Sequence, residues 1–430
     1  MEHRRLQILF AVISLFAFGV IVWYFLFSKP ETAPTLQTPT SAFSLRDLPA
    51  RFAFIFQGDN PDSNTETEVT PAGAIPFTRI SDNPATGNIF VSRPILREVT
   101  STSTVGTTTI STTKTVRATT TVLMFVDRVT GYVYGHSIES GKTYQISNTT
   151  IPGIFDAYIW AGGDRIVMRY LDTDRKTVVS ILASVPNVQE GRDPEPLIDT
   201  TYLPQNITSV TVSKNLSTLS YVVPGSNGST IYSLSSRGTS RVADSSFSEW
   251  TLSYGGEQLY ATSNASAYVE GTTVVLPSFS SVVGGKTGLL STPSASGPVL
   301  NSMWTRSGLA TFGVNVGKTI SFTTKTLASK CIGTVSPYFI CGVPQSIPEG
   351  VEGLPDDWYQ GRFMFRDTLS VINAQSGETY TLYSFPENYG EIDVTHLATS
   401  VNSDLISFIR KQDSTLFLLN TNLLADEPVE

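Results

Sequence analysis

The sequence predicts an all-β protein, a β-propeller with seven blades favoured and six possible, preceded by a single N-terminal transmembrane helix. The prediction rests on a charge-poor composition, a unit of short strands that recurs about every 40 residues, and one long apolar segment. Charged residues make up 15% of the chain, against about a quarter in a typical soluble domain. Thr, Val, Ile, Tyr and Phe are abundant and favour strands, while amphipathic helical periodicity is absent after residue 30.

The N-terminal segment Leu6–Phe27 contains no charged residue and is long enough to cross a hydrocarbon core about 30 Å thick. Arg4 and Arg5 precede it, and Trp23 and Tyr24 lie near its far end, as in an interfacial aromatic belt. The positive-inside rule then places the N-terminus in the cytoplasm and the remaining chain outside. A cleaved signal peptide is the alternative, but bulky residues follow the segment where cleavage needs small ones.

A linker is predicted after the helix, because this stretch is rich in proline and contains the polar, acidic segment Gly58–Glu68. The apolar island Arg51–Phe56 interrupts the linker, and we expect it to dock on the folded domain rather than on lipid headgroups. The predicted organisation is a cytoplasmic stub and transmembrane helix at 1–28, the linker at 29–74, the propeller at 75–425 and a tail at 426–430.

The repeated unit is clearest in Val210–Gly238, Glu249–Pro277 and Val394–Asn422, where short apolar strands alternate with small polar turns. Its length of about 40 residues suits a four-stranded propeller blade, whereas a β-solenoid would have a shorter, more regular repeat. Each unit has apolar residues on both faces, and radial stacking in a ring covers both. The fifth unit is the weakest match, which leaves six blades open. The predicted units are 84–150, 154–200, 205–244, 247–285, 287–329, 330–386 and 392–425.

Ring closure is predicted from the ends of this domain. The last unit stops after three strands, at Leu416–Asn420. Phe77–Ser81, which precedes the first unit, resembles the fourth strand at Thr143–Ser147. We therefore expect this N-terminal strand to complete the last blade.

Two segments interrupt the repeat. Glu98–Thr121 consists mostly of Ser and Thr with interspersed Val and Ile, and is either a hairpin turning near Gly106 or disordered. Pro344–Gly361 is a second insertion, rich in Pro and Gly.

Several segments resemble membrane-anchored propeller proteins encoded by small-genome candidate-phylum bacteria, and the short turns SKNL, SYGG and SVNS are similar to a degraded Ser-Pro-Asp-Gly turn of the TolB-type repeat. The resemblance covers roughly residues 77–422 and is most specific from Cys341 to Gly361. It implies the fold and an envelope location, and it carries over no functional residue. The segments are FTRISDNPATG (77–87), ISNTTIP (146–152), KTLASKC (325–331), CGVPQSIP (341–348) and PDDWYQG (355–361).

Composition and motifs argue against several classes of function. The net charge of −8 does not suit a nucleic-acid binder, which needs a basic face. No G-x-S-x-G elbow is present, His136 and His396 are more often packed or exposed than catalytic, and neither a metal site nor a cofactor is predicted. Glycosidases also use propellers, with paired carboxylates in the central channel. The candidates here are Asp164, Asp244, Glu249 and Asp404.

A disulfide between Cys331 and Cys341 is predicted, because the intervening sequence reads strand, turn, strand and an extracytoplasmic site permits oxidation. Two buried free thiols are the alternative. A binding loop is predicted at Asp356, Asp357, Trp358 and Tyr359, where two carboxylates stand beside two aromatic residues in an insertion. The alternative is that Trp358 folds back and caps an apolar edge between blades.

The sequence thus predicts a non-enzymatic interaction or scaffold module, anchored in the membrane and exposed in the cell envelope, with a protein partner. The alternative is a carbohydrate-binding module or a glycan-active enzyme that uses the central pocket of the propeller.

Overall fold

The computed structural model describes residues 76–426, except 106–107, 296, 316 and 335–336. The predicted transmembrane helix and the linker lie outside the described residues. Within the described part of the chain, no helix is long and apolar enough to cross a membrane.

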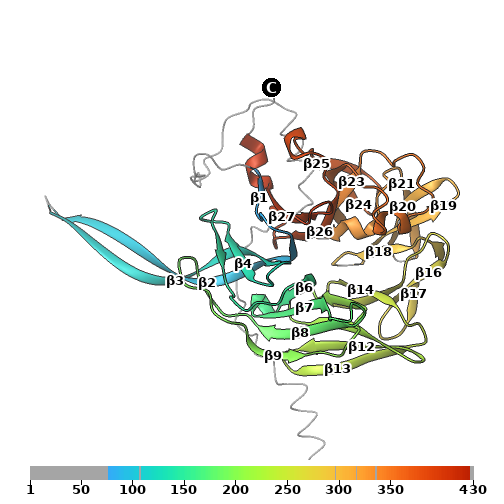
Figure 1. Ribbon diagram of the computed structural model, residues 1–430. Coiled ribbons are helices and arrows are strands. Elements are labelled where there is room, and N and C mark those ends of the chain that lie inside the picture. Colours follow the sequence, from blue (N-terminus) through green and yellow to red (C-terminus); the bar gives the residue numbers. More distant parts are fainter. Residues whose placement is uncertain (1–75, 106–107, 296, 316, 335–336, 427–430) are drawn as a thin grey trace, which may run out of the picture. The chain divides into compact units, whose positions relative to one another are not determined.

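The described residues form seven antiparallel four-stranded sheets, which are the blades of a β-propeller (Figure 1). Each predicted unit corresponds to one sheet, including the fifth, so the choice of seven blades over six is confirmed. Blade 1 contains β2 (Ala85–Val105), β3 (Thr108–Asp127), β4 (Val133–Ser137) and β5 (Thr143–Gln145). Blade 2 contains β6 (Ile154–Trp160), β7 (Arg165–Leu171), β8 (Val178–Ser184) and β9 (Ile198–Tyr202), with η2 (Ala161–Gly163) between β6 and β7.

Blades 3 to 5 follow the same order along the chain. Blade 3 contains β10 (Ser209–Val212), β11 (Leu219–Gly225), β12 (Gly228–Ser235) and β13 (Gly238–Ser245). Blade 4 contains β14 (Trp250–Gly255), β15 (Gln258–Ser263), β16 (Glu270–Val275) and β17 (Ser280–Thr287). Blade 5 contains β18 (Leu290–Pro293), β19 (Val299–Thr305), β20 (Gly308–Asn315) and β21 (Lys318–Phe322).

The other short helices of the described residues lie in or beside the last two blades. Blade 6 contains β22 (Cys331–Gly333), β23 (Tyr338–Pro344), β24 (Asp367–Asn373) and β25 (Thr379–Tyr383). Blade 7 contains β26 (Val394–Thr399), β27 (Leu405–Arg410), β28 (Leu416–Asn420) and, from the other end of the chain, β1 (Phe77–Arg79). The helices are η3 (Ala328–Lys330), α3 (Asp356–Tyr359), η4 (Glu387–Tyr389) and η5 (Thr421–Asp426).

Strand β1 closes the ring as predicted. It pairs antiparallel with β28, with Phe77 opposite Leu419. The Phe77 ring is 2% exposed and stacks on Phe417 at a centroid distance of 5.2 Å. Hydrogen bonds and an aromatic contact therefore both hold the first described strand to the last blade.

The core lies between blades, because neighbouring residues of a strand point to opposite faces of its sheet. Strand β3 shows this most directly. Met124 belongs to a cluster that includes Ile166 of blade 2, whereas Phe125 belongs to one that includes Leu405 of blade 7. A blade with apolar residues on both faces is thus covered by its two neighbours, which is the physical reason for the ring.

The first insertion is a hairpin made by the outer parts of β2 and β3 (Figure 1). The register runs from Ile95 opposite Ala118 to Val105 opposite Thr108. The alternative of a disordered insertion is therefore wrong. The third strand of the blade, β4, pairs with β3 only over Val122–Val126, so among the described residues the outer ladder has two strands.

Candidate functional site

The second insertion occupies residues 345–366, between β23 and β24, and contains the helix α3. Pro355 precedes the helix, and its carbonyl accepts a hydrogen bond from the Tyr359 N–H at 2.9 Å. Proline suits the start of a helix because its fixed φ is already close to the helical value. The local sequence therefore favours one helical turn at the segment where the sequence analysis places its binding loop.

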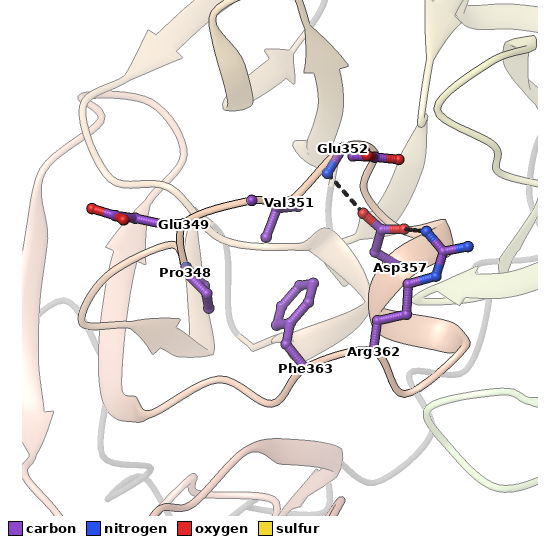
Figure 2. A pocket seen from close by; sticks show the side chains of 8 residues that line it. Pro348, Glu349, Val351, Glu352, Asp357, Arg362 and Phe363 are labelled. Atoms are coloured by element: carbon purple, nitrogen blue, oxygen red, sulfur yellow. Dashed lines mark hydrogen bonds and ion pairs between the residues drawn. The ribbon is translucent and has the colours of Figure 1, made fainter.

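Asp357 organises the insertion from within (Figure 2). Its Oδ2 atom accepts hydrogen bonds from the backbone N–H groups of Glu352 and Gly353, both at 2.9 Å. Its Oδ1 atom forms an ion pair with Nη1 of Arg362 at 2.7 Å. The Gly353 N–H, together with Glu352 and Arg362, lowers the pKa of this carboxyl against the opposing effect of desolvation. The carboxylate thus ties both ends of a Gly- and Pro-rich loop together.

A cavity of about 210 Å³ lies beside this ion pair (Figure 2). Its apolar lining includes Pro348, Val351 and Phe363, and the exposed residues Glu349 and Glu352 also line it. The cavity is smaller than the roughly 300 Å³ at which small-molecule sites begin. It suits a single inserted side chain. Its lining residues are Pro348, Glu349, Gly350, Val351, Glu352, Asp357, Arg362 and Phe363.

The insertion reaches two other blades. Towards blade 4, Oδ2 of Asp356 accepts a hydrogen bond from the N–H of Ala267 at 2.6 Å. Towards blade 7, Nε1 of Trp358 donates to Oδ2 of Asp393 at 2.7 Å, and Nζ of Lys411 donates to the Trp358 carbonyl. Ala267 and Lys411 lie in loops between the second and third strands of their blades, and Asp393 lies in the connection between blades 6 and 7. In a propeller these loops are on the same face of the ring.

These contacts correct the predicted binding loop. Asp357 and Trp358 are 3% and 4% exposed, so their assignment to a contact surface is wrong, and Trp358 has the capping position of the alternative. Both side chains are buried because each has a hydrogen-bond partner inside the protein. Asp357 accepts from backbone N–H groups of the loop, and Trp358 donates to Asp393 at the entry of blade 7. Asp356 is partly buried and bonded to blade 4. Tyr359 alone of the four is largely open, with 53% of its surface exposed.

Two further exposed apolar residues lie on the loop of blade 4 that Asp356 contacts. Tyr268 and Val269, in the β15–β16 connection, are 70% and 61% exposed. They follow Ala267, whose N–H donates a hydrogen bond to Asp356. Gly353 of the insertion also lies close to Tyr268, since a Cβ added to Gly353 would be 3.2 Å from the Tyr268 hydroxyl oxygen. We call Tyr268, Val269 and Tyr359 the Tyr268–Tyr359 surface. Sequence reasoning missed its blade 4 half, because nothing local distinguishes these residues from other turn residues.

The hydroxyl of Tyr359 is in contact with the propeller. Desolvation raises its pKa, although a hydrogen bond with Ser329 acts in the opposite direction. Ser329 belongs to η3, the helix that leads into blade 6. About half of the Tyr359 surface is thus open to solvent, while its hydroxyl is held by η3.

The other predicted chemical groups do not converge. His136 is buried, with Nδ1 2.9 Å from Oγ1 of Thr143, and desolvation lowers its pKa. His396 lies on the first strand of blade 7, where the surrounding protein also lowers its pKa. The four carboxylates contact different partners, which are Arg93 for Asp164, Arg241 for Asp244, Asn264 for Glu249 and Ser400 for Asp404. Among residues 76–426 as described, no group of three or more metal-ligating side chains is close enough to hold an ion.

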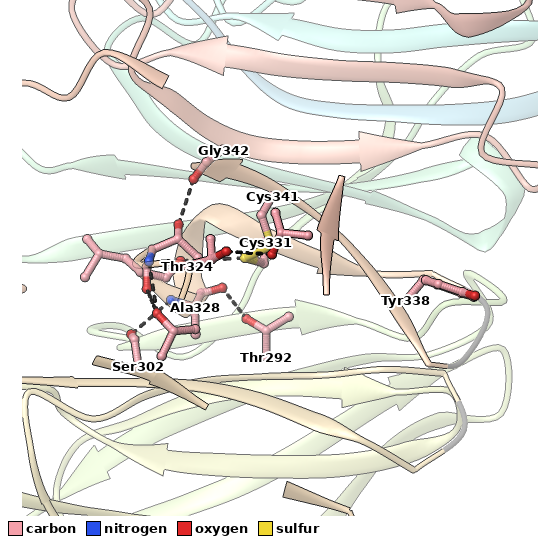
Figure 3. The surroundings of a disulfide bond; sticks show 12 residues. Thr292, Ser302, Thr324, Ala328, Cys331, Tyr338, Cys341 and Gly342 are labelled. Atoms are coloured by element: carbon pink, nitrogen blue, oxygen red, sulfur yellow. Dashed lines mark hydrogen bonds between the residues drawn. A yellow bond between two sulfur atoms is a disulfide. The ribbon is translucent and has the colours of Figure 1, made fainter. Parts of the chain in front are cut away.

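A disulfide joins Cys331 and Cys341 (Figure 3). The two cysteines stand directly opposite in the β22–β23 pair, with a Cα–Cα distance of 4.1 Å. Neighbouring polar contacts hold the same region to blade 5, where Thr292 Oγ1 donates to the Ala328 carbonyl and Ser302 Oγ accepts from the Ala328 N–H. The first strand of blade 6 is thus fixed both covalently and by hydrogen bonds.

Comparisons with known proteins find similar structures but no similar sequences. No protein-family model matches the chain, and no curated protein matches it. Among solved structures, the β-propeller domain of the Trilobed protease from Pyrococcus furiosus is similar at a TM-score of 0.44 and 8% identity, over 70% of this chain and 89% of that one. The β-propeller domain of Cps50 (Swd1) from Myceliophteria thermophila is similar at a TM-score of 0.40 and 8% identity, over 70% and 93%.

Proposed function

We propose that the chain is a non-enzymatic interaction module of the cell envelope, anchored by its N-terminal segment, and that it binds a protein partner through the Tyr268–Tyr359 surface. The observation that carries the proposal is the presence of three large, exposed apolar side chains on two connected loops of one face. Loops on a rigid scaffold commonly carry recognition, and tyrosines are enriched among the residues that dominate binding energy. The apolar segment Leu6–Phe27, with two arginines before it, supports the location.

The neighbouring cavity narrows the chemistry of the partner. Glu349 and Glu352 place negative charge at its edge, while Arg362 is already paired with Asp357. A lysine or arginine side chain could lay its methylene groups against Val351 and Phe363 and bring its charge to the carboxylates. The partner therefore presents a basic side chain beside an apolar patch.

The test replaces both exposed tyrosines and measures partner capture. Tyr268→Ser combined with Tyr359→Ser should leave the melting temperature nearly unchanged and reduce crosslinking to the partner in the native membrane by at least about 30-fold, the equivalent of about 2 kcal/mol for a central contact. Tyr202→Ser is the matched control, because Tyr202 is 73% exposed but lies on β9 of blade 2. Unchanged capture by the double variant would contradict the proposal.

Carbohydrate binding is the second candidate, since exposed tyrosines beside carboxylates can stack on sugar rings and accept hydrogen bonds from hydroxyls. Cosedimentation of the purified chain with isolated envelope polysaccharide distinguishes the two. Loss of cosedimentation in the double tyrosine variant, without any captured protein, would favour the carbohydrate.

A further inference from the structure

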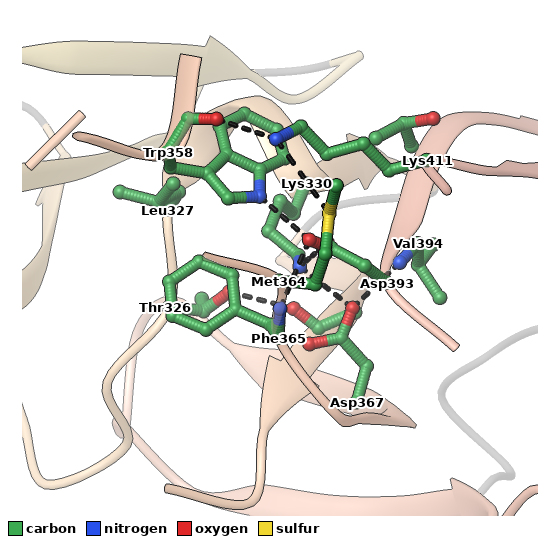
Figure 4. A network of polar contacts seen from close by, with 12 residues as sticks. Thr326, Leu327, Lys330, Trp358, Met364, Phe365, Asp367, Asp393, Val394 and Lys411 are labelled. Carbon is green, nitrogen blue, oxygen red and sulfur yellow. Dashed lines mark hydrogen bonds and ion pairs between the residues drawn. The ribbon is translucent and has the colours of Figure 1, made fainter. Parts of the chain in front are cut away.

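Lys330, the last residue of η3, is buried between two carboxylates (Figure 4). Its Nζ atom is 2.7 Å from Oδ2 of Asp367 and also forms an ion pair with Oδ1 of Asp393. All three side chains are 0% exposed or nearly so. Asp367 begins β24, and Asp393 immediately precedes β26, so the contact joins blade 6 to the entry of blade 7.

Two aromatic rings attract the ammonium, but the buried surroundings are unfavourable for two ionised carboxylates. The Nζ atom lies 4.4 Å from the ring centroid of Phe365 and 5.3 Å from that of Trp358. Two carboxylates face one ammonium here, and removal of ionised carboxylates from water is costly. Burial accordingly raises the pKa of Asp367 to about 6, and its Oδ1 atom is buried without a hydrogen-bond partner. Conversion of charged groups to neutral ones would remove much of this cost.

The two oxygens of Asp393 have different environments. Oδ2 accepts hydrogen bonds from Nε1 of Trp358 at 2.7 Å and from the Phe365 N–H at 3.0 Å. Oδ1 faces Lys330. Two donors on one carbonyl oxygen polarise the carbon and stabilise negative charge that develops on that oxygen, as an oxyanion hole does.

We propose that Lys330 and Asp393 condense into an intramolecular isopeptide bond, with Asp367 as the proton carrier. The three side chains supply the three groups that this reaction needs, namely a desolvated amine, a polarised carboxyl and a nearby base.

The reaction balances without an external reagent. The Lys330 ammonium first gives one proton to Oδ1 of Asp393, which leaves a neutral amine and a neutral acid. The lone pair of Nζ forms a bond to Cγ, and the carbonyl π electrons move to Oδ2, where Trp358 and Phe365 donate hydrogen bonds. Asp367 removes a second proton from Nζ and delivers it to the Oδ1 hydroxyl. The Cγ–Oδ1 bond breaks, water leaves, the carbonyl re-forms, and Asp367 returns to its initial state.

The bond would link positions 63 residues apart in the sequence. It would lie next to the disulfide at Cys331, so two covalent links would fix the start of blade 6. Because the amide carries no net charge, it would replace the buried Lys330–Asp393 ion pair. This inference is independent of the binding function proposed above.

The test is mass spectrometry of the purified full chain after reduction and denaturation. We expect a mass one water molecule below that of the sequence. Trypsin should fail to cut after Lys330, and the peptide containing it should be joined to Asp367–Arg410, with fragment ions placing the link on Asp393. A full-mass protein whose Lys330 reacts with an amine reagent after unfolding would overturn the proposal, and so would a link to Asp367.

Variants separate the roles. Asp367→Asn keeps the shape of the site and should abolish or strongly slow formation of the bond, because the proton carrier is lost. The control is Lys411→Arg, since Lys411 lies 4.7 Å from the Trp358 ring centroid but is not in contact with either carboxylate through an ion pair. This control should keep the link. A link formed as completely and rapidly in Asp367→Asn as in the unaltered chain would overturn the assignment of Asp367.

Discussion

The β2–β3 hairpin and the insertion at 345–366 both interrupt the repeat of blades, but their backbones obtain hydrogen bonds in different ways. The hairpin pairs its own two strands from Ile95–Ala118 out to Val105–Thr108. The insertion combines local backbone bonds, such as that from the Tyr359 N–H to the Pro355 carbonyl, with bonds to the Asp357 side chain and with contacts of its own side chains to blades 4 and 7. A strand-forming sequence can satisfy its backbone locally, whereas a Pro- and Gly-rich one needs tertiary partners. Stability of the ring should therefore depend on the second segment far more than on the first.

The largest expected effect on stability comes from the loss of β1. The hairpin strands pair with each other, whereas β1 pairs with β28 at the other end of the propeller sequence. A chain lacking residues 1–70 should fold, while one lacking 1–82 should lose more than about 3–5 kcal/mol, since Phe77 is buried and β28 would become an open edge. Urea unfolding of the two chains measures the difference. Equal midpoints would show that β1 contributes nothing to closure.

Within the insertion, Trp358→Ala should lower the free energy of unfolding by about 3–5 kcal/mol. The substitution removes a buried ring and leaves Oδ2 of Asp393 without its Nε1 donor. Tyr359→Ala is the matched control, because this neighbour is 53% exposed and should cost much less. Thermal and chemical unfolding should give the same order of stability for the two variants. Similar losses in the free energy of unfolding would show that burial of Trp358 does not stabilise the protein more than Tyr359 does.

The disulfide at the base of the insertion should have an intermediate effect. Replacement of Cys331 and Cys341 by alanine should cost about 2.5–3 kcal/mol, because the bond closes a short loop in the unfolded chain. Labelling of the unaltered protein under denaturing, non-reducing conditions should detect no free thiol. Two labelled cysteines would support the alternative of a reduced pair.

The smallest effect is expected from the hairpin. Joining Ile95 to Ala118 through an Asn-Gly turn, which favours two-residue hairpins, should change the free energy of unfolding by no more than about 0.5 kcal/mol. The remaining part of β3 keeps its pairing with β4 at Val122–Val126. Circular dichroism during thermal unfolding would reveal the change, and a loss of several kcal/mol would show that the outer ladder also stabilises the ring.

Features with a local or periodic signature could be predicted from the sequence. The alternation of short apolar strands and polar turns favoured seven sheets over six, and the missing fourth strand of the last unit pointed to Phe77–Ser81. The ten-residue separation of Cys331 and Cys341 within a strand–turn–strand pattern placed the cysteines opposite each other. These predictions succeed because a β-strand's side-chain direction and a hairpin's register depend on nearby residues.

Only the tertiary structure decided which residues of the insertion are buried and which reach solvent. Trp358 and Tyr359 are adjacent and both aromatic, yet one is buried with an acceptor on Asp393, 35 residues away, and the other is 53% exposed. In the same way, Lys330 meets Asp367 and Asp393 only when the strands of blade 6 pair and blade 7 packs against them. Burial of a polar or aromatic side chain depends on partners that distant segments provide, and a sequence pattern contains no record of their distance in space.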